Sequence, residues 1–398
     1  MFKKITTSLY ALSGFFMLLC ACNYSAHATQ LVEGKIGFFK HANTTFDSYS
    51  AKPDTKQQQW MQKHYQRMLV YTPYFDARLN WYPSAWFYKD SYAIYIGSET
   101  AKKHPEWILR DEKNNALYIP WECHGKCDQY AGDFGNPEFR KFKIEEIRAA
   151  LTKGYKGVWL DDVNLTWRVG DNKEDHVTPV DKRTGKLMVL KDWCRYFAEF
   201  MEDIRAAFPG TEIAHNAIWY ADSLESENPF ISRQISAANY INIERGANDS
   251  GLTGGDGPWG YLTFLRYLDY VHQRGVSVIL MDAGITPDER EYGLATALLV
   301  SNGNDLINSN QPDWTTPDHW WPGYDINLGA AENSRYKWRG LLRRDFECGR
   351  VLVNQPGMPE QLVRIKGKFQ RIDGAPIKKL HLAGKSAAIL IKKSCKQH

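Results

Sequence analysis

Residues 155–163, Tyr-Lys-Gly-Val-Trp-Leu-Asp-Asp-Val, are the stretch that decides the fold. A short apolar run of this kind is typical of a buried strand that helices cover on both faces. The run ends in two carboxylates, Asp161 and Asp162, which are costly to bury unless they lie at a wet rim. The stretch therefore predicts one strand of a parallel β/α barrel, with Asp161 as a catalytic carboxylate at the end of the strand.

Helices and strands alternate along the rest of the chain. Residues 136–138, Asn-Pro-Glu, form a helix start with a cap residue, proline at the first helical position and an acid in the first turn. From there we expect four helix–strand repeats and one last short strand, and three candidate strands lie upstream. The expected strands are residues 35–39, 68–71, 92–96, 155–163, 212–216, 240–246, 276–282 and 306–308.

This pattern predicts an α/β fold in which residues 31–344 form a (β/α)8 TIM-type barrel, with residues 72–86 as a long loop. A doubly wound open sheet is the alternative. That fold usually carries a Gly-rich phosphate fingerprint after an early strand, and no early strand of this chain is followed by one.

The C-terminal part differs in composition from the barrel. Short strand-like runs separated by Pro-Gly turns predict a small antiparallel, β-sandwich-like domain over residues 345–398. It carries no repeated acid or histidine cluster, so we expect it to pack against the barrel.

The N-terminus predicts export. Two lysines precede an apolar run at residues 9–19 that is too short for a comfortable membrane span, as in a signal peptide over residues 1–28. Two cleavage sites remain open. Residues 26–28 are an A-x-A site, whereas residues 19–22 resemble a lipobox, which would end the signal at residue 21 and place a lipid on Cys22. Either site predicts a secreted protein or one of the periplasm or cell envelope.

Five cysteines follow the signal. In an oxidising compartment, Cys123 and Cys127 are expected to close a small disulfide loop, because His124 alone is a poor start for a zinc site. Cys194 lies in a helix pattern and is expected to be a buried thiol. Cys348 and Cys395 are candidates for a second pair, which the sequence does not decide.

Composition and motifs exclude several classes of function. The net charge of +4 includes two lysines of the signal, so the mature chain is nearly neutral and does not indicate nucleic-acid binding. We find neither a G-x-S-x-G elbow nor an H-E-x-x-H motif, and we expect no metal and no cofactor. The 14 Trp, 22 Tyr and 18 Phe residues fit either a large core or a cleft lined with rings that stack on sugars.

Acids at strand ends are the main chemical signal. Asp161, Asp162, Glu244 and Asp282 end three of the expected strands. Glycoside hydrolysis needs two carboxylates that flank one bond, although rim acids also cap helices or pair with bases. Because side chains alternate along a strand, we expect only one of Asp161 and Asp162 to face the barrel mouth. If Asp161 faces inward, Trp159 does so too.

A family resemblance adds roles to these residues. Residues 157–163 resemble the fourth-strand motif of a group of hypothetical bacterial glycosyl hydrolases related to the α-galactosidase and α-amylase barrels. Residues 104–109, 133–137 and 349–354 resemble further segments of that group. The resemblance implies that Asp161 is the nucleophile. By position on a later strand it implies Glu244 as the proton donor, with Asp282 in reserve.

Other rim residues are candidates for binding substrate. His215 and Asn216 end a strand and can bond sugar hydroxyls, although a buried core histidine is an equal alternative. Arg245 would hold Glu244 ionised, which suits a nucleophile better than an acid. The rings expected to stack on sugar are Trp159, Trp314 and Trp321.

The sequence therefore predicts an exported, monomeric glycoside hydrolase that cleaves a poly- or oligosaccharide, with a two-carboxylate, retaining mechanism. The alternative is an inactive barrel that binds carbohydrate at the cell envelope. Sugar, linkage and endo or exo action are not encoded in any motif that we recognise.

Overall fold

The computed structural model describes residues 33–163, 166–173, 175–216, 229–282, 284–309 and 314–395, without the side chain of Asp282. The predicted signal segment and Cys22 lie outside these residues. The Cys123–Cys127 disulfide is present and Cys194 is buried, as predicted. A second disulfide joins Cys348 and Cys395, a pairing that the sequence left open. Within the described residues, no helix has the length and apolar character that crossing a membrane requires.

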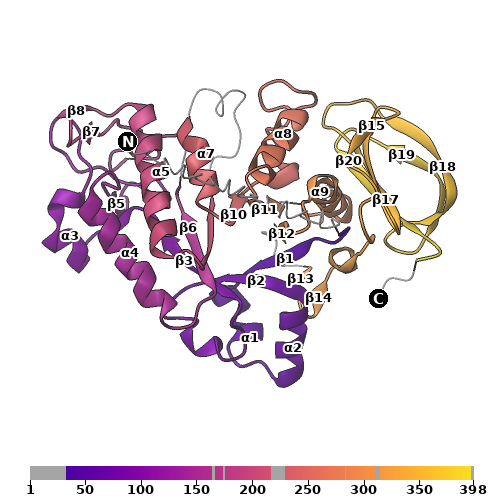
Figure 1. Cartoon of the computed structure of the whole chain (residues 1–398), viewed down its shortest axis with the longest axis horizontal. Helices are drawn as coiled ribbons and strands as arrows, with labels where there is room; N and C mark the ends of the chain where they lie inside the picture. The colour runs from indigo at the N-terminus through magenta and orange to yellow at the C-terminus, as the bar shows by residue number, and fades with distance from the viewer. Residues whose placement is uncertain are drawn as a thin grey trace, which may run out of the picture. The chain divides into compact units, whose positions relative to one another are not determined.

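Eight parallel strands close into a barrel in the order β1-β12-β11-β10-β9-β6-β3-β2, which confirms the predicted fold class (Figure 1). The strands are β1 (Gly37–His41), β2 (Tyr65–Val70), β3 (Ala85–Asp90), β6 (Gly157–Asp161), β9 (Glu212–Asn216), β10 (Tyr240–Ile243), β11 (Ser277–Asp282) and β12 (Leu306–Ser309).

The stretch that predicted the fold forms β6, between β3 and β9. Gly157 begins this strand where the backbone of Glu212 is close, since a Cβ on Gly157 would lie 2.2 Å from the Glu212 carbonyl oxygen. Inward side chains, among them Phe39, Trp86 and Trp159, fill the centre of the barrel as a separate apolar cluster. The barrel interior is thus a packed core, and its mouth is where chemistry can take place.

One predicted strand is not part of the barrel. The third barrel strand is β3, of which the first two residues fall in the predicted loop and the other four in no predicted element. Residues 93–95, expected to be in the third barrel strand, form β4 (Ala93–Tyr95) and pair with β5 (Gln129–Ala131) outside the barrel. β3 was missed because it ends in the polar residues Lys89 and Asp90, which the barrel rim accommodates.

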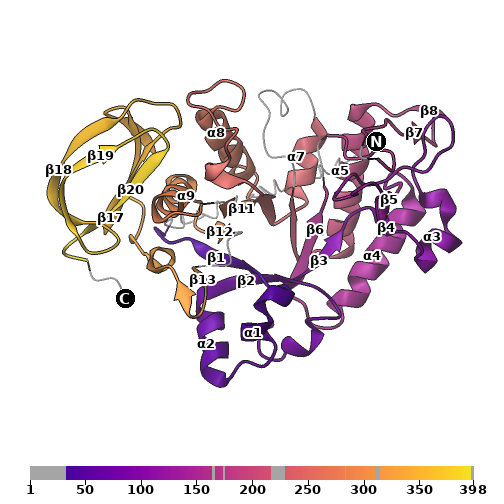
Figure 2. The ribbon, with the colours of Figure 1, turned by 180° about the vertical axis from the view of Figure 1, so that it is seen from behind.

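Helices surround the strands (Figures 1 and 2). Asn136 caps α4 as predicted, through a hydrogen bond from the Glu138 amide to its side chain, and Thr286 and Glu289 form a capping box on α9. The α-helices are α1 (Asp47–Ser50), α2 (Thr55–His64), α3 (Glu99–Lys103), α4 (Pro137–Leu151), α5 (Leu190–Ala207), α7 (Pro229–Ser236), α8 (Tyr261–His272) and α9 (Pro287–Val300). The 3-10 helices are η1 (Thr44–Phe46), η2 (Asp76–Arg78), η3 (Pro105–Trp107), η4 (Gly246–Asn248) and η5 (Pro322–Asp325).

Two long excursions leave the carboxyl ends of β3 and β6 before α4 and α5 begin. The first contains β4, β5 and the Cys123–Cys127 disulfide, and the second contains β7 (Val180–Asp181) and β8 (Lys186–Leu187). The two excursions contact each other, because Tyr118 pairs with both Tyr130 and Gly170. They therefore build one joined rim beside the barrel mouth.

The C-terminal part is a six-stranded antiparallel sheet in the order β15-β16-β17-β20-β18-β19. Its first strands lie before residue 345, where we expected the small domain to begin, because charged residues obscure their strand pattern. Its strands are β15 (Tyr336–Trp338), β16 (Leu341–Phe346), β17 (Gly349–Asn354), β18 (Gln361–Gln370), β19 (Pro376–Leu382) and β20 (Ser386–Lys392), and a hairpin of β13 (Thr315–Thr316) and β14 (His319–Trp320) precedes it.

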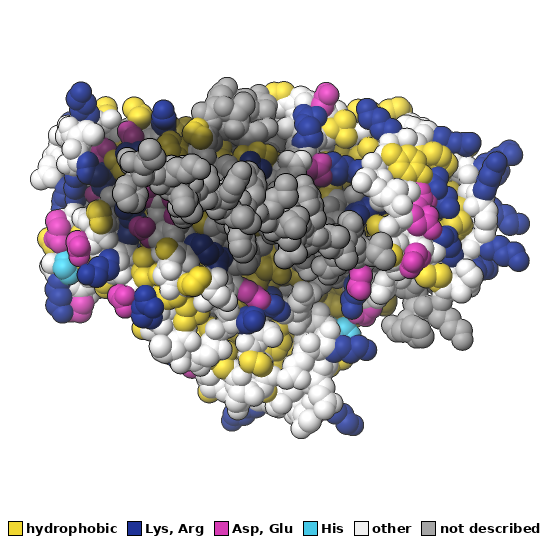
Figure 3. All heavy atoms as spheres, in the orientation of Figure 1, with side chains coloured by type: hydrophobic (Ala, Val, Ile, Leu, Met, Phe, Trp, Pro, Cys, Tyr) yellow, Lys and Arg dark blue, Asp and Glu magenta, His cyan; other side chains and the backbone are white. Residues whose placement is uncertain are grey.

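Helix α9 joins the sheet to the barrel. Glu291 on α9 accepts hydrogen bonds from the Ile389 amide and from Arg371, and burial raises the pKa of its carboxyl. Arg344 on β16 donates in turn to the carbonyls of Leu298 and Ser301. Lysines and arginines gather over β18 and β19, at the right-hand edge in Figure 3, and the exposed ones are Arg364, Lys366, Lys368, Lys378 and Lys379.

Candidate active site

A cavity of about 340 Å³ lies at the carboxyl ends of the barrel strands. The cavity is lined by inward-pointing side chains that lie two residues beyond the barrel core along each strand. They share a face with the core residues because side chains alternate along a strand. Phe39 is thus followed by His41, Trp86 by Tyr88 and Leu306 by Asn308. Asp161 lies two residues after Trp159 in the same way. Both side chains therefore point inward, as expected if Asp161 faces the mouth. The cavity is also lined by Tyr71, Asp162, Arg168, Glu244 and Met281.

Asp161 is held by three hydrogen-bond donors. Its Oδ1 accepts from Asn216 Nδ2 at 2.6 Å and from the Asp162 amide at 2.8 Å, and its Oδ2 accepts from the Tyr88 hydroxyl at 2.6 Å. Three donors on two oxygens fix the orientation of this carboxyl group at the cavity.

Asn216 joins the two carboxylates predicted to do the chemistry. Its Nδ2 also donates to Glu244 Oε1, at 2.7 Å. The accepting oxygens of Asp161 and Glu244 therefore lie no more than 5.3 Å apart, which is the sum of the 2.6 Å and 2.7 Å bonds. Carboxyl groups about 5–5.5 Å apart are typical of retaining glycosidases, whereas inverting enzymes separate them by roughly 6.5–9.5 Å.

Asp162 also lines the cavity, which differs from the expectation that only one of the two acids would do so. Its backbone φ of +59° takes the chain out of the strand conformation, so alternation no longer fixes the direction of its side chain. Arg168 Nη1 lies 2.8 Å from Asp162 Oδ1, and both side chains are largely buried. Asp162 is thus the partner of a fixed cation.

Aromatic rings form one wall of the cavity. Tyr71 and Tyr88 have ring centroids 5.1 Å apart, and Tyr88 and Trp159 stack at 5.7 Å. Burial raises the pKa of Tyr88, and the neighbouring Asp161 adds to this rise. The hydroxyl of Tyr88 therefore stays protonated and keeps donating to Asp161 throughout the range of pH in which an enzyme works.

Several buried polar atoms at the cavity have no hydrogen-bond partner within the described part of the chain. They are His41 Nε2, Trp159 Nε1 and Asn308 Oδ1, with Asn216 Oδ1 beside Asp161. Most buried polar groups of proteins are bonded, so a set of open atoms around one cavity indicates a polar ligand. Burial, followed by the charge of Lys40, lowers the pKa of His41, which leaves its ring neutral and able to bond a hydroxyl group.

A second cavity, of about 320 Å³, shares Tyr71, Tyr88 and Asp90 with the first. Asp90 accepts hydrogen bonds from the amides of Tyr92 and Ala93, and burial raises the pKa of its carboxyl. Lys143 donates to the Ala93 carbonyl, and burial lowers the pKa of its amine to about 8. The two cavities together extend the cleft along the ends of β2 and β3.

Two predicted binding residues lie away from the cavity. His215 is fully buried, its ring nitrogens lie 3.3 Å and 3.4 Å from backbone oxygens, and burial lowers its pKa to about 4. Arg245 is 73% exposed and its nearest acid is Asp249, at 3.9 Å. Both residues neighbour an inward residue in the sequence, so strand alternation turns them outward.

Of the three tryptophans expected to bind sugar, Trp159 lines the cavity, whereas Trp314 and Trp321 do not. Trp321 is buried against Tyr324, and Trp320 packs on Phe38, an outward residue of β1. Trp314 is 42% exposed and contacts Arg290 on α9. Because the hairpin after β12 packs on the outside of the barrel, its rings do not line the cavity. Asp282 ends β11, and its side chain lies outside the described residues.

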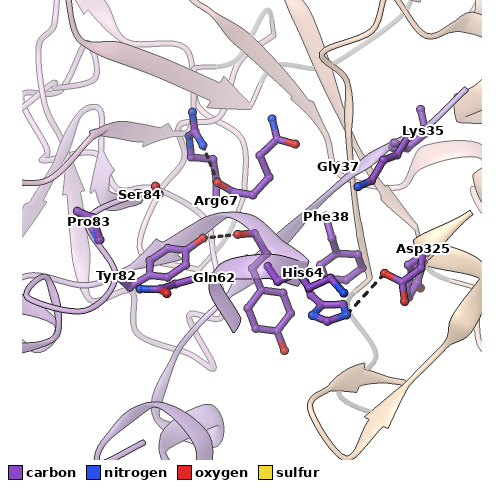
Figure 4. A pocket seen from close by; sticks show the side chains of 15 residues that line it. Lys35, Gly37, Phe38, Gln62, His64, Arg67, Tyr82, Pro83, Ser84 and Asp325 are labelled. Atoms are coloured by element: carbon purple, nitrogen blue, oxygen red, sulfur yellow. Dashed lines mark hydrogen bonds and ion pairs between the residues drawn. The ribbon is translucent and has the colours of Figure 1, made fainter. Parts of the chain in front are cut away.

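A larger cavity, of about 470 Å³, lies at the opposite end of the barrel (Figure 4). It opens at the amino ends of β1 and β2, where His64 faces Asp325 across 3.7 Å. Arg67, on its wall, makes a two-bond ion pair with Glu212. This end of a TIM barrel usually serves stability, so the carboxylate pair at the other end is the better candidate site.

An eight-stranded barrel with paired carboxylates at its mouth is typical of glycoside hydrolases. The chain belongs to hypothetical glycosyl hydrolase family 15, whose model matches residues 67–350. The protein is therefore a glycoside hydrolase, which confirms the resemblance stated from its motifs.

Solved structures of two α-amylases share the fold. A maltogenic α-amylase from Thermotoga neapolitana has a TM-score of 0.51 and 13% identity, over 90% of this chain and 98% of that one. An α-amylase from Lactobacillus plantarum has a TM-score of 0.50 and 12% identity, over the same shares. The glycoside hydrolase domain of PelA from Pseudomonas aeruginosa has a TM-score of 0.40 and 13% identity, over 70% and 95%. A search of curated proteins gives no match.

Proposed function

We propose that this protein is a retaining glycoside hydrolase in which Asp161 is the nucleophile and Glu244 the general acid and base. The shared Asn216 amide carries this proposal, because it holds one oxygen of each carboxylate within 5.3 Å of the other, which is compatible with the close spacing of a retaining pair. The two residues also differ in their surroundings. Asp161 accepts from three donors, whereas Glu244 accepts from Asn216 alone among the described residues.

In the first step, Asp161 attacks the anomeric carbon of the bound sugar as Glu244 gives its proton to the glycosidic oxygen. The C–O bond to the leaving sugar breaks and a glycosyl ester with Asp161 forms. In the second step, Glu244 takes a proton from water, which attacks the same carbon and releases Asp161 as a carboxylate. Protons and charges balance over the two steps, and no cofactor takes part.

Asp162 is the less suitable nucleophile. Its Oδ1 is already paired with Arg168 at 2.8 Å, and the guanidinium lowers the reactivity of an oxygen that it neutralises. We assign Asp162 the role of holding Arg168 at the cavity wall. Asn216, His41 and Asn308 would bond hydroxyl groups of the sugar, since each has an open polar atom at or beside the cavity.

A screen on polysaccharides tests this function. The mature protein should release reducing ends from at least one neutral or charged polysaccharide, with α-linked ones tested first. Proton NMR of the first product should show the anomeric configuration of the substrate. An inverted first product would remove Asp161 from the role of nucleophile. Binding without any turnover would favour the alternative, a carbohydrate-binding barrel of the cell envelope.

Export and envelope attachment are part of the proposal. Disulfides such as Cys123–Cys127 and Cys348–Cys395 form and persist in oxidising compartments, and the N-terminal sequence resembles a signal peptide. The carbohydrate substrate would then be outside the cytoplasm. Cell fractionation of wild type and Cys22→Ala tests the lipid: only a lipoprotein would move from the membrane fraction to the soluble fraction on this change.

A further inference from the structure

Trp121 is the most exposed aromatic residue that lines the candidate site. Its side chain is 61% exposed, and it lines the same cavity as Asp161 and Glu244. A tryptophan this open to solvent is unusual, because burying its ring would remove a large apolar area from water. Of the rings that we expected to stack on sugar, Trp314 and Trp321 lie outside the cavity, and Trp159 lines it but is only 5% exposed. Trp121 is therefore the ring most open to a sugar.

The ring of Trp121 is supported from one side by Arg168. The guanidinium carbon of Arg168 lies 5.2 Å from the ring centroid, and the same guanidinium pairs with Asp162 at 2.8 Å. A cation over the electron-rich face of an indole holds the ring by electrostatic attraction. Trp121 is thereby linked, through Arg168 and Asp162, to the residue next to the proposed nucleophile.

The loop that carries Trp121 is fixed at several points. The Trp121 amide donates to the Ile119 carbonyl at 2.9 Å, and the Cys123–Cys127 disulfide closes the chain just after it. The amide of Cys127 donates to Asn172 on the neighbouring excursion, at 2.9 Å. A ring held this way loses little conformational freedom when a ligand stacks on it, which favours binding.

We propose that Trp121 is the stacking platform of a second sugar subsite, next to the sugar whose bond is cleaved. This inference rests on the proposed function and adds the class of substrate, which is a chain of at least two sugar units. The apolar CH face of a pyranose ring packs on the indole, and Arg168 occupies the other face. The first sugar lies below it, among Asp161, Glu244 and the open atoms of His41 and Asn308.

Affinity electrophoresis tests the subsite without turnover. All variants carry Glu244→Gln, which removes the proposed proton donor. The gels contain soluble starch, galactomannan, chitosan or alginate. Trp121→Ala should weaken retardation by the polysaccharide that retards the parent, with about a tenfold higher Kd, and Trp121→Phe should restore most of it. The matched control is Trp259→Ala, a residue that is 51% exposed and does not line the cavity.

Each outcome decides the proposal. The subsite is supported if Trp121→Ala loses retardation by the polysaccharide, Trp121→Phe regains it and Trp259→Ala keeps it. Equal retardation of Trp121→Ala and its parent overturns it, and so does an equal loss in Trp259→Ala. Kinetics separate this inference from the proposed function. In an otherwise wild-type protein, Trp121→Ala should raise KM for the polysaccharide and leave kcat within about twofold, whereas failure of the catalytic assignment is measured on Asp161 variants.

Discussion

The Tyr88 hydroxyl donates a hydrogen bond of 2.6 Å to Oδ2 of Asp161, from β3 across to β6. Tyr88→Phe removes this donor and keeps the ring. Because a hydrogen bond to a charged group contributes about 1.5–3 kcal/mol, we expect kcat/KM to fall about ten- to hundredfold. The matched control is Tyr82→Phe, since Tyr82 donates to the buried Tyr65 carbonyl away from the mouth. Tyr82→Phe should lower Tm and leave kcat/KM unchanged; equal kinetic losses in both variants would contradict the role of Tyr88.

Asn216→Ala removes the amide that bridges Asp161 and Glu244. Without it, two carboxylates face each other with no donor between them, and their positions are no longer fixed. We expect kcat/KM to fall by about hundredfold or more, with a near-native Tm, because misplacing reacting groups reduces rate more than stability. The measurement is initial rate and thermal unfolding on the same preparation. A variant with wild-type rates would show that the bridge does not position the pair.

Arg168→Met removes the guanidinium that pairs with the largely buried carboxylate of Asp162. Breaking a buried pair costs several kcal/mol, and since Arg168 is partly exposed we expect a loss of about 3 kcal/mol in the free energy of unfolding. Adding Asp162→Asn to this variant should restore most of it, because the buried charge is then gone. Denaturant titration of the two single variants and the double variant measures the coupling. Strictly additive losses would contradict the pairing.

Asp162→Asn by itself should retain much more activity than any variant that neutralises Asp161. The reason is that Asp162 pairs with Arg168, whereas Asp161 is the residue that we propose to react. Comparing kcat of the two asparagine variants therefore separates adjacent carboxylates that the sequence could not distinguish. A greater loss of kcat for Asp162→Asn would reverse the assignment.

His215 links stability to acidity. Its folded pKa of about 4 lies below the ordinary value of 6.5, because the charged ring would be buried. Between these two values the unfolded chain binds more protons than the folded protein, so stability falls as pH drops from about 6.5 towards 4. At pH 5 this amounts to about 2 kcal/mol. His215→Phe should reduce the difference in stability between pH 7 and pH 5 by that amount, and an unchanged difference would show that His215 does not titrate this way.

The barrel could be predicted because its signals are local. Single elements can be recognised from short stretches of sequence. Examples are the apolar run that ends at Asp161, the capped start of α4 and the periodic apolar face of α5. The third strand was misplaced because Lys89 and Asp90 look like loop residues, although a barrel rim accepts them. The start of the C-terminal sheet was misplaced for a similar reason. The charged residues of β15 and β16 obscure the apolar pattern of these strands.

The candidate site could be predicted only in part. Asp161 and Glu244 stand out as acids at strand ends, but His41, Tyr88 and Asn308 look like ordinary polar or aromatic residues. Each lies two residues after an inward core residue of its strand, and strand alternation could therefore have identified them. The positive φ of Asp162 could not be predicted, since aspartate is enriched in that conformation but most aspartates do not adopt it. Nor could the outward packing of Trp321, because it depends on the hairpin after β12.

The most direct test of the account is the rate of Asp161→Asn on the polysaccharide that the wild-type protein cleaves, measured as reducing ends released. Asparagine keeps the shape of the side chain and removes the nucleophile, so we expect kcat to fall by at least about 10³-fold with Tm and polysaccharide binding preserved. Hydrolysis at the wild-type rate by a pure, folded Asp161→Asn protein would contradict the central claim that Asp161 attacks the sugar.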